Sequence, residues 1–143
     1  VCHSQDKVKL FALGEEQKYF TAGKKEEIRL FTCNDGLKVG VLVCFELRFP
    51  YFWEQLKGAD IILVPAFWGL ERKSHFEVLT RALAIANQCY VIAANSTDES
   101  MCSSSAIINP FGEVIKDDKA NHLSTLADTK TIKTMRRYIN IGL

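Results

Sequence analysis

The sequence predicts an α/β fold built around neighbouring parallel strands. Residues 39–43 and 61–64 are short, continuous apolar runs, which are typical of strands that helices cover on both faces of a sheet. Between them, residues 51–57 can form a helix that begins after Pro50, whose missing N–H suits a first helical turn, and that ends at Gly58. Strand, helix and strand in direct succession form a right-handed βαβ unit, which places the two apolar runs side by side.

A hairpin is predicted to lead into this unit. Residues 26–33 alternate in part between apolar and polar side chains, and Asn-Asp-Gly at residues 34–36 is a turn signal. After the βαβ unit, Ser74 and Glu77 have the spacing of a capping box, which predicts a helix from there to Gln88 with His75 exposed in its first turn. The remaining expected elements are strands at residues 89–95, 105–108, 113–116 and 121–128, a turn at 109–112, a helix at 129–137 and an extended tail at 138–143.

The composition is that of one globular domain with a real core. The 143 residues are 48% hydrophobic and 24% charged, and the net charge is +1 with Lys and Arg scattered along the chain. A nucleic-acid partner and a membrane span are therefore not expected. The cysteines are odd in number and form no Cys-x-x-Cys pair, and the three histidines have no ligand spacing. We expect a reducing cytoplasm and neither a disulfide framework nor a metal or other cofactor.

The candidate nucleophile is Cys44, which follows the apolar strand at residues 39–43. The carboxyl ends of parallel strands are where open α/β sheets bind ligands, and a helix start there offers free backbone N–H groups. Position alone also suits an ordinary buried cysteine, because such cysteines are common in protein cores. The sequence around Cys44 distinguishes the two interpretations.

Residues 44–50, Cys-Phe-Glu-Leu-Arg-Phe-Pro, resemble the nucleophile segment of the nitrilase superfamily of carbon–nitrogen hydrolases. Its amidase branches usually carry Cys-Tyr-Asp-x-Arg-Phe-Pro, whereas true nitrilases carry Cys-Trp-Glu, so the resemblance implies an amide hydrolase. Residues 5–11 are similar to the family's Tyr-x-Lys-x-His-Leu-Phe segment, with Lys7 at the catalytic lysine and with Gln5 and Lys9 as departures. The helix at residues 81–87 and the hairpin at residues 105–112 also resemble those of the family.

A second carboxylate is implied near the nucleophile. Residues 16–23 resemble the family's Glu-x-x-x-Phe-x-x-Gly element, which makes Glu16 the match and Glu15 the alternative register. Phe67 and Trp68 follow the strand at residues 61–64, and they either wall a pocket over the nucleophile or belong to the core.

The resemblance implies a role for each matched residue. Cys44 would attack the amide carbonyl, Lys7 and the backbone N–H of Phe45 would stabilise the oxyanion, and Glu16 would position Lys7 or the substrate. A cation beside the thiol would also favour the thiolate. The general base of the family's Cys-Glu-Lys triad is a different glutamate on an N-terminal strand, to which no position here corresponds, and Glu46 does not occupy the base's place in the motif.

The implied fold is a four-layer α-β-β-α sandwich, of which residues 1–143 are expected to be the C-terminal part of a single carbon–nitrogen hydrolase domain. The chain begins at Val1 inside the resemblance, so we expect that the N-terminal portion is missing and that the fragment alone is inactive. Homodimers or larger homo-oligomers are the expected assembly. An N-carbamoyl amine and a small dicarboxylic monoamide both remain open as substrates, and an inactive interaction module without the general base is the alternative function.

Overall fold

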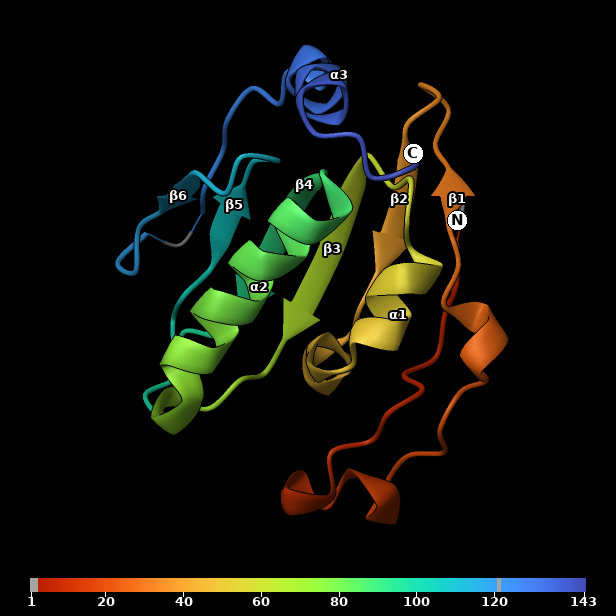
Figure 1. Cartoon of the computed structure of the whole chain (residues 1–143). Helices are drawn as coiled ribbons and strands as arrows, with labels where there is room; N and C mark the ends of the chain where they lie inside the picture. The colour runs from red at the N-terminus through yellow and green to blue at the C-terminus, as the bar shows by residue number, and fades with distance from the viewer. Residues whose placement is uncertain (1–2, 121) are drawn as a thin grey trace.

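Six strands form one mixed sheet in chain order (Figure 1). The computed structural model describes residues 3–120 and 122–143. The central strands β2, β3 and β4 are parallel to one another, whereas β1, β5 and β6 pair antiparallel with their neighbours. The strands are β1 (Phe31–Thr32), β2 (Lys38–Val41), β3 (Ile61–Ala66), β4 (Tyr90–Asn95), β5 (Ala106–Ile108) and β6 (Val114–Lys116).

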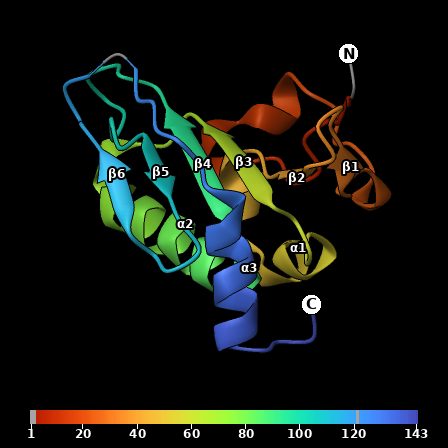
Figure 2. The same cartoon turned by 90° about the horizontal axis from the view of Figure 1, so that it is seen from above.

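Three helices accompany the sheet, and two of them are the crossovers of its parallel strands. They are α1 (Pro50–Gln55), α2 (Lys73–Asn87) and α3 (Thr129–Tyr138). Because α1 joins β2 to β3 and α2 joins β3 to β4, the predicted βαβ unit is confirmed and repeated once. Figure 2 shows α1 and α2 on the same side of the sheet. Single 3₁₀ turns lie at Ala12–Gly14, Glu16–Lys18, Lys25–Glu27, Cys44–Arg48 and Leu70–Arg72.

The core lies between the sheet and the two crossover helices. Ile62 and Val64 of β3 are fully buried there with Phe52 of α1 and with Phe76 and Leu83 of α2. Successive strand residues point to opposite faces, so the alternate positions of the sheet face away from these helices. On that opposite face Ile92 of β4 keeps 37% of its side-chain surface exposed. One face of the sheet is therefore packed and the other stays accessible within the described residues.

The approach of α1 to the sheet depends on a residue without a side chain. A Cβ atom built on Gly40 of β2 would lie 2.8 Å from Leu56, directly after α1, and Leu56 is fully buried. Just before β3, Arg136 of α3 donates to the carbonyl of Ala59 at 2.6 Å, and its guanidinium lies 3.5 Å from the carboxylate of Asp60. These contacts fix the two ends of the loop that enters β3.

Three of the expected elements are wrong in detail. Residues 26–33 contribute only β1, because the chain turns at Lys25–Glu27 and the Glu27 side chain accepts from the backbone N–H of Asp6. The capping box is absent, since α2 begins at Lys73 and Glu77 instead accepts from Ser104 and Lys116. His75 is exposed as expected.

The predicted strand at residues 121–128 is also wrong for its described part, residues 122–128, which contain no strand. Residue 121 lies outside the described residues. Leu126 is 97% exposed, so the segment has no apolar face to bury, and it pairs with no strand edge. The extended backbone therefore has no ladder to join.

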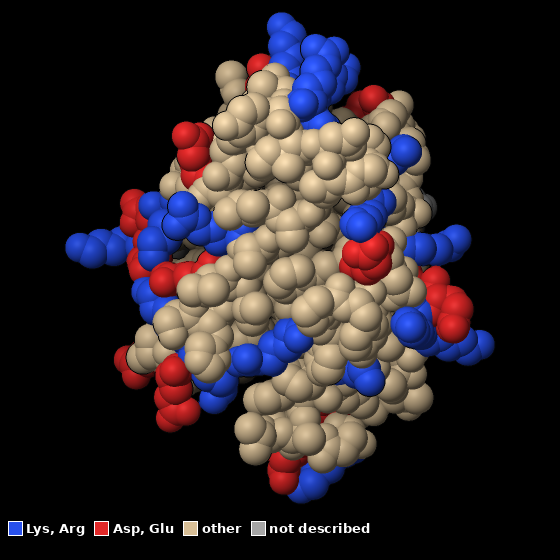
Figure 3. Space-filling model, viewed as in Figure 1, with Lys and Arg blue, Asp and Glu red and all other residues tan. Residues whose placement is uncertain are grey.

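Charged side chains of both signs lie around the rim of the face seen in Figure 3, and the centre of that face over α1 and α2 is mostly uncharged. Among the described residues, no helix has the length and apolar character that a bilayer crossing requires. The fold as a whole is a mixed α/β sheet, in agreement with the class that the sequence predicts.

Candidate functional site

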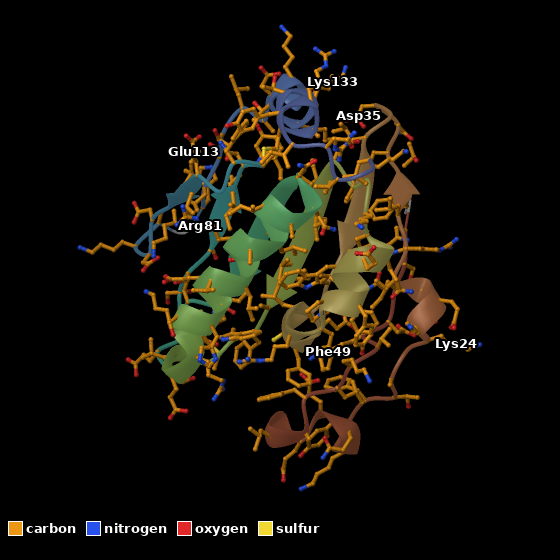
Figure 4. The ribbon with its side chains drawn as sticks, viewed as in Figure 1. Lys24, Asp35, Phe49, Arg81, Glu113 and Lys133 are labelled. Carbon is orange, nitrogen blue, oxygen red and sulfur yellow. The ribbon has the colours of Figure 1, made fainter. Side chains whose placement is uncertain are left out.

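Cys44 lies at the point where the chain leaves β2 and enters α1. It opens the 3₁₀ turn Cys44–Arg48 and has a φ angle of 50°, in the left-handed region that residues with a side chain rarely adopt. Such backbone strain is concentrated at functional sites, where the surrounding structure holds it in place. Phe49, labelled in Figure 4, follows the turn and packs its ring against Phe45 and Phe52. The strained turn is therefore anchored in the core from its carboxyl end.

Lys7 and Glu16 form a close ion pair beside this turn. The Nζ atom of Lys7 lies 2.6 Å from each carboxylate oxygen of Glu16, and the two side chains are only 16% and 24% exposed. The Oε2 atom of Glu16 also accepts from the backbone N–H of Phe11 at 2.8 Å. The alternative carboxylate, Glu15, pairs with exposed Lys18 instead. The structure thus brings Glu16, and not Glu15, to Lys7.

The three predicted side chains line one pocket. The strands β2 and β3, after which Cys44 and Phe67 follow, end at the same edge of the sheet (Figure 1). The volume of the pocket is about 500 Å³. Besides Cys44, Lys7 and Glu16, its lining includes Asp6, Leu10, Phe20, Thr21, Val43, Pro65, Ala66 and Phe67. Residues far apart in the chain meet here because β2 and β3 are parallel and in register, so both end at the same edge.

Phe67 and Trp68 have different surroundings. Phe67 is 63% exposed and lines the pocket, whereas Trp68 is 4% exposed and packs its ring 5.4 Å from that of Phe76. The side chain of Asn95 fixes this turn by accepting from the backbone N–H of Trp68 at 2.7 Å. Phe67 is accordingly a pocket residue, and Trp68 is chiefly a core residue whose edge reaches a second, smaller recess.

This second recess, also beside Cys44, contains two arginines to which sequence analysis gave no role. Arg48 places its guanidinium 4.7 Å from the centre of the Trp68 ring and lies 3.1 Å from Nδ1 of His75. Arg72 lies 5.7 Å from the centre of the Phe11 ring. The lining comprises Phe11, Cys44, Phe45, Arg48, Phe67, Trp68, Gly69 and Arg72, without any carboxylate. Arg72 also lies 3.4 Å from the carboxylate of exposed Glu71, and the recess has a volume of only about 20 Å³. Two cations in its lining favour a nearby anion.

The surroundings of Cys44 favour the protonated form of its thiol. Burial raises its pKa and outweighs three lowering effects, which are backbone hydrogen bonds at Phe67 and Phe45 and the charge of Lys7. The charge of Glu16 opposes them. Lys7 therefore acts in the expected direction, but its charge is not enough to produce a thiolate. Nucleophilic attack from this site requires a base to take the proton.

The sequence analysis excluded Glu46 as the general base and gave it no other role. Its side chain is fully buried, and its carboxylate accepts from the backbone N–H groups of Val8, Lys9 and Val43 at 2.5, 3.3 and 2.7 Å. Burial raises the pKa of Glu46, and these three donors oppose the increase. Val43 lies in the same turn, but Val8 and Lys9 are far away in the sequence, and no local pattern reveals these two partners.

The described residues contain no group of three or more His, Cys, Asp and Glu side chains that could hold a metal ion. The chemistry that the two recesses can support is that of a thiol, an ammonium group and backbone N–H donors. Such a set suits attack on a carbonyl carbon with charge developing on its oxygen.

Comparison with known proteins shows the family of the chain. The sequence profile of the carbon–nitrogen hydrolase family matches residues 3–139. An omega-amidase of Escherichia coli strain K12, YafV, is 32% identical over 141 residues, which are 95% of this chain and 54% of the relative. A 2-oxoglutaramate amidase of Bacillus subtilis strain 168 is 36% identical over 117 residues, 78% of this chain and 44% of the relative. The chain thus spans about half the length of these relatives.

Solved structures share the fold. Nit3 of Saccharomyces cerevisiae, a member of the nitrilase superfamily, superimposes with a TM-score of 0.81 at 22% identity, over 96% of this chain and 52% of Nit3. An amidase of Nesterenkonia, with acrylamide added to its active-site cysteine, gives a TM-score of 0.66 at 24% identity, over 76% and 44% of the two chains. With the family profile covering nearly the whole sequence, this chain belongs to the carbon–nitrogen hydrolase family.

Proposed function

We propose that this chain carries the cysteine and the lysine of an amidase that cleaves small amides through a thioester on Cys44. The observation that supports the proposal is the shared pocket, in which the Cys44 turn faces the Lys7–Glu16 pair. The backbone N–H of Phe45, which hydrogen-bonds the thiol, supplies a second donor at the same place. An ammonium group and an N–H beside a nucleophile are suited to the oxyanion of acyl transfer.

In the first half of the reaction, the Sγ atom of Cys44 attacks the amide carbonyl carbon while a general base takes the thiol proton. The carbonyl electron pair moves to oxygen, where Lys7 and the N–H of Phe45 stabilise the negative charge. The C–N bond then breaks, and the base returns the proton to the leaving nitrogen. The products of this half are an amine, or ammonia, and a thioester on Cys44.

In the second half, the same base takes a proton from water, and the resulting hydroxide attacks the thioester carbonyl carbon. The C–S bond breaks, the carboxylic acid leaves, and the proton returns to the sulfur of Cys44. Each proton that the base accepts is passed on, so no oxidant, reductant or metal is consumed. Glu16 holds the Lys7 ammonium throughout by its two short contacts.

The general base belongs, in this proposal, to a glutamate outside the 143 residues. Glu16 is paired with Lys7, and Glu46 is fully buried with both oxygens occupied by backbone donors, so neither is free to take the thiol proton. The accessible face of the sheet, on which Ile92 lies, is where the second sheet of the expected sandwich would pack. The missing portion would then supply both the base and the cover of this face.

The substrate class that we propose is a small amide that carries a carboxylate, such as the monoamide of a dicarboxylic acid. Arg48 and Arg72 line the recess beside Cys44 and place two positive charges there, of which Arg48 also contacts His75 and Arg72 also contacts Glu71. The names of the omega-amidase and 2-oxoglutaramate amidase relatives point to the same class. An N-carbamoyl amino acid also bears a carboxylate, so assays of both classes side by side separate these two substrates.

The test uses the complete protein and compares each acid with its neutral methyl ester. We expect turnover of the acid, no turnover by Cys44→Ala, and a thioester adduct on Cys44 in mass spectra of the quenched reaction. Arg72→Gln should raise KM for the acid and leave KM for the ester unchanged. Arg81→Gln is the matched control, because Arg81 lines a separate groove between α2 and β6 (Figure 4). A folded complete protein without turnover or adduct would instead support the inactive interaction module.

A further inference from the structure

The buried carboxylate of Glu46 joins the two chain segments that carry Lys7 and Cys44. Its Oε1 atom accepts from the N–H groups of Val8 and Lys9, and its Oε2 atom accepts from the N–H of Val43. Val8 directly follows Lys7, and Val43 directly precedes Cys44. Each side of the carboxylate is therefore bonded to the residue next to one of the two reactive side chains.

The ring contacts between the two segments are longer than these hydrogen bonds: Nζ of Lys9 lies 5.5 Å from the centre of the Phe49 ring, and the rings of Phe11 and Phe45 lie 5.0 Å apart. Residues 7–9 and residue 43 lie outside the strands, so no ladder of backbone hydrogen bonds connects them. The side chain of Gln5 reaches the carbonyl of Val41 at 3.3 Å, which is a longer contact to a neutral acceptor. On its other side, the Lys7 segment is held by the backbone N–H of Gly23, which donates to the Lys7 carbonyl at 2.9 Å. Glu46 thus provides the shortest connection between the segments.

A fully buried carboxylate loses its hydration, and only good hydrogen bonds offset that cost. Glu46 has such bonds, but it lines neither the large pocket nor the smaller recess beside Cys44. It therefore does not touch a substrate in either space. Any effect of Glu46 on the reaction must pass through the groups that it holds.

We propose that Glu46 is a positioning residue that sets where the Lys7 ammonium stands relative to the Cys44 thiol. The inference rests on the proposed function in assigning Lys7 and Cys44 their roles, while its geometry is independent of any substrate. Without the carboxylate, the segment at residues 7–9 loses its bond to the Cys44 turn, and the Lys7 charge moves away from the sulfur.

The direction in which the Cys44 thiol pKa changes on replacing Glu46 separates this positioning role from a direct electrostatic effect and from a purely structural role. A carboxylate that acted directly on Cys44 through space would raise the thiol pKa, so removing its charge would lower that pKa. A carboxylate that acts by holding Lys7 near the sulfur has the opposite effect, because moving the cation away raises the thiol pKa. Removal of a residue needed only for folding would lower thermal stability and leave the thiol pKa unchanged.

The experiment follows alkylation of Cys44 by iodoacetamide as a function of pH, with the modified peptide quantified by mass spectrometry. Glu46→Gln replaces one acceptor oxygen by an NH₂ group that cannot accept, so one of the two segments loses its bond. We expect the pH midpoint of alkylation to rise and the rate at pH 7 to fall about tenfold, the equivalent of one pKa unit. Lys7→Ala should have the same effect, and the double variant should be no slower than Lys7→Ala alone.

Glu46→Asp tests the connection itself and disturbs the fold less. The shorter side chain keeps its charge and its bond to Val43, which lies in the same turn, but no longer reaches the backbone of Val8 and Lys9. A rise in the alkylation midpoint is again expected. Leu83→Ala is the control for stability, because Leu83 is fully buried in α2 and lines neither space beside Cys44.

Three results would overturn the proposal. They are an unchanged or lowered alkylation midpoint in either Glu46 variant, an equal rise in Leu83→Ala at the same loss of thermal stability, and full additivity of Glu46→Gln with Lys7→Ala. Alkylation requires no substrate and no turnover. A failure of the proposed amidase activity would therefore leave this test intact, and the two failures can be told apart.

Discussion

At the scale of single residues, the site combines a strained cysteine with a buried ion pair. Cys44 has left-handed backbone geometry and a thiol pKa raised by burial, and Lys7 is the nearby cation that lowers it. Cys89 is different, because it is fully buried in the core and burial raises its pKa to about 12. Of these two thiols, only Cys44 faces an open pocket beside a cation.

Lys7→Arg is expected to reduce kcat of the complete enzyme by about 10²–10³, the usual cost of losing one oxyanion donor. The guanidinium is planar and larger than the ammonium, so it cannot hold the same position between Glu16 and Cys44. Steady-state kinetics measure the loss of kcat, and circular dichroism is the control for folding. Lys18→Arg, at an exposed ion pair, is the matched control and should be neutral. Near-normal kcat in Lys7→Arg would remove Lys7 from the site.

At the scale of elements, two contacts fix the helices to the sheet. Gly40 lets α1 approach β2, because any side chain there would collide with Leu56. Glu77 of α2 accepts from Lys116 of β6 and from Ser104, each at 2.8 Å, and so ties the amino end of the helix to the hairpin β5–β6. The residues of these two contacts line neither space beside Cys44, so they test the fold and not the chemistry.

Gly40→Ala is expected to lower the free energy of unfolding by about 1–3 kcal/mol, the typical cost of overpacking a core. Its added Cβ would lie 2.8 Å from the fully buried Leu56, which has to shift. Urea denaturation measures the loss. In a Leu56→Ala background the same substitution should cost less, because the space is then open. Equal costs in the two backgrounds would contradict this packing argument.

The contact at Glu77 predicts a pH dependence of stability. The Lys116 ammonium and the Ser104 hydroxyl hold the pKa of Glu77 below its usual value. A carboxyl whose pKa is lower in the folded state stabilises the fold above its unfolded pKa, and this stabilisation is lost as the pH falls through the folded pKa. Thermal melts between about pH 5 and pH 3 should therefore show a smaller acid-induced decrease for Glu77→Gln than for the parent or for exposed Glu99→Gln. Parallel curves for all three proteins would rule out the contribution.

At the scale of the whole molecule, one face of the sheet is packed by α1 and α2, and the other carries accessible apolar side chains such as Ile92. The carboxyl-terminal residues after α3 are also accessible, with Ile139 46% and Leu143 44% exposed. An open sheet face of this kind needs a covering layer in a stable domain. The expected homo-oligomer, to which this tail would contribute, remains a prediction.

Residues 1–143 alone are expected to show no steady turnover of small amide substrates. They are also expected to bind a dye that fluoresces on apolar surfaces. Both follow from the proposed location of the general base and of the second sheet outside these residues. Co-expression with a segment that carries the proposed general base and second sheet should restore turnover and reduce dye binding together. Sustained turnover by residues 1–143 alone would show that they contain their own base, and would overturn that part of the proposal.

Much of the arrangement could be predicted from the sequence because it is local. The apolar runs at residues 39–43 and 61–64, Pro50 and Gly58 define the βαβ unit, which the structure confirms. Cys44 follows from its place at the end of a strand, and Lys7 and Glu16 follow from the family resemblance. The resemblance implied that Glu16 positions either Lys7 or the substrate, and the structure gives a 2.6 Å contact between Lys7 and Glu16.

Tertiary structure decided whatever depends on partners far away in the chain. The Glu77 carboxylate bonds to a hairpin instead of its own helix end, and residues 122–128 find no strand edge to pair with. Glu46 accepts from backbone donors nearly forty positions earlier. Arg72 and Arg48 line the same recess only because the segment before α2 packs beside the Cys44 turn. A short-range pattern sets which strands and turns form, because side-chain periodicity and turn residues are local. The charge around the thiol depends on which segments the fold brings together.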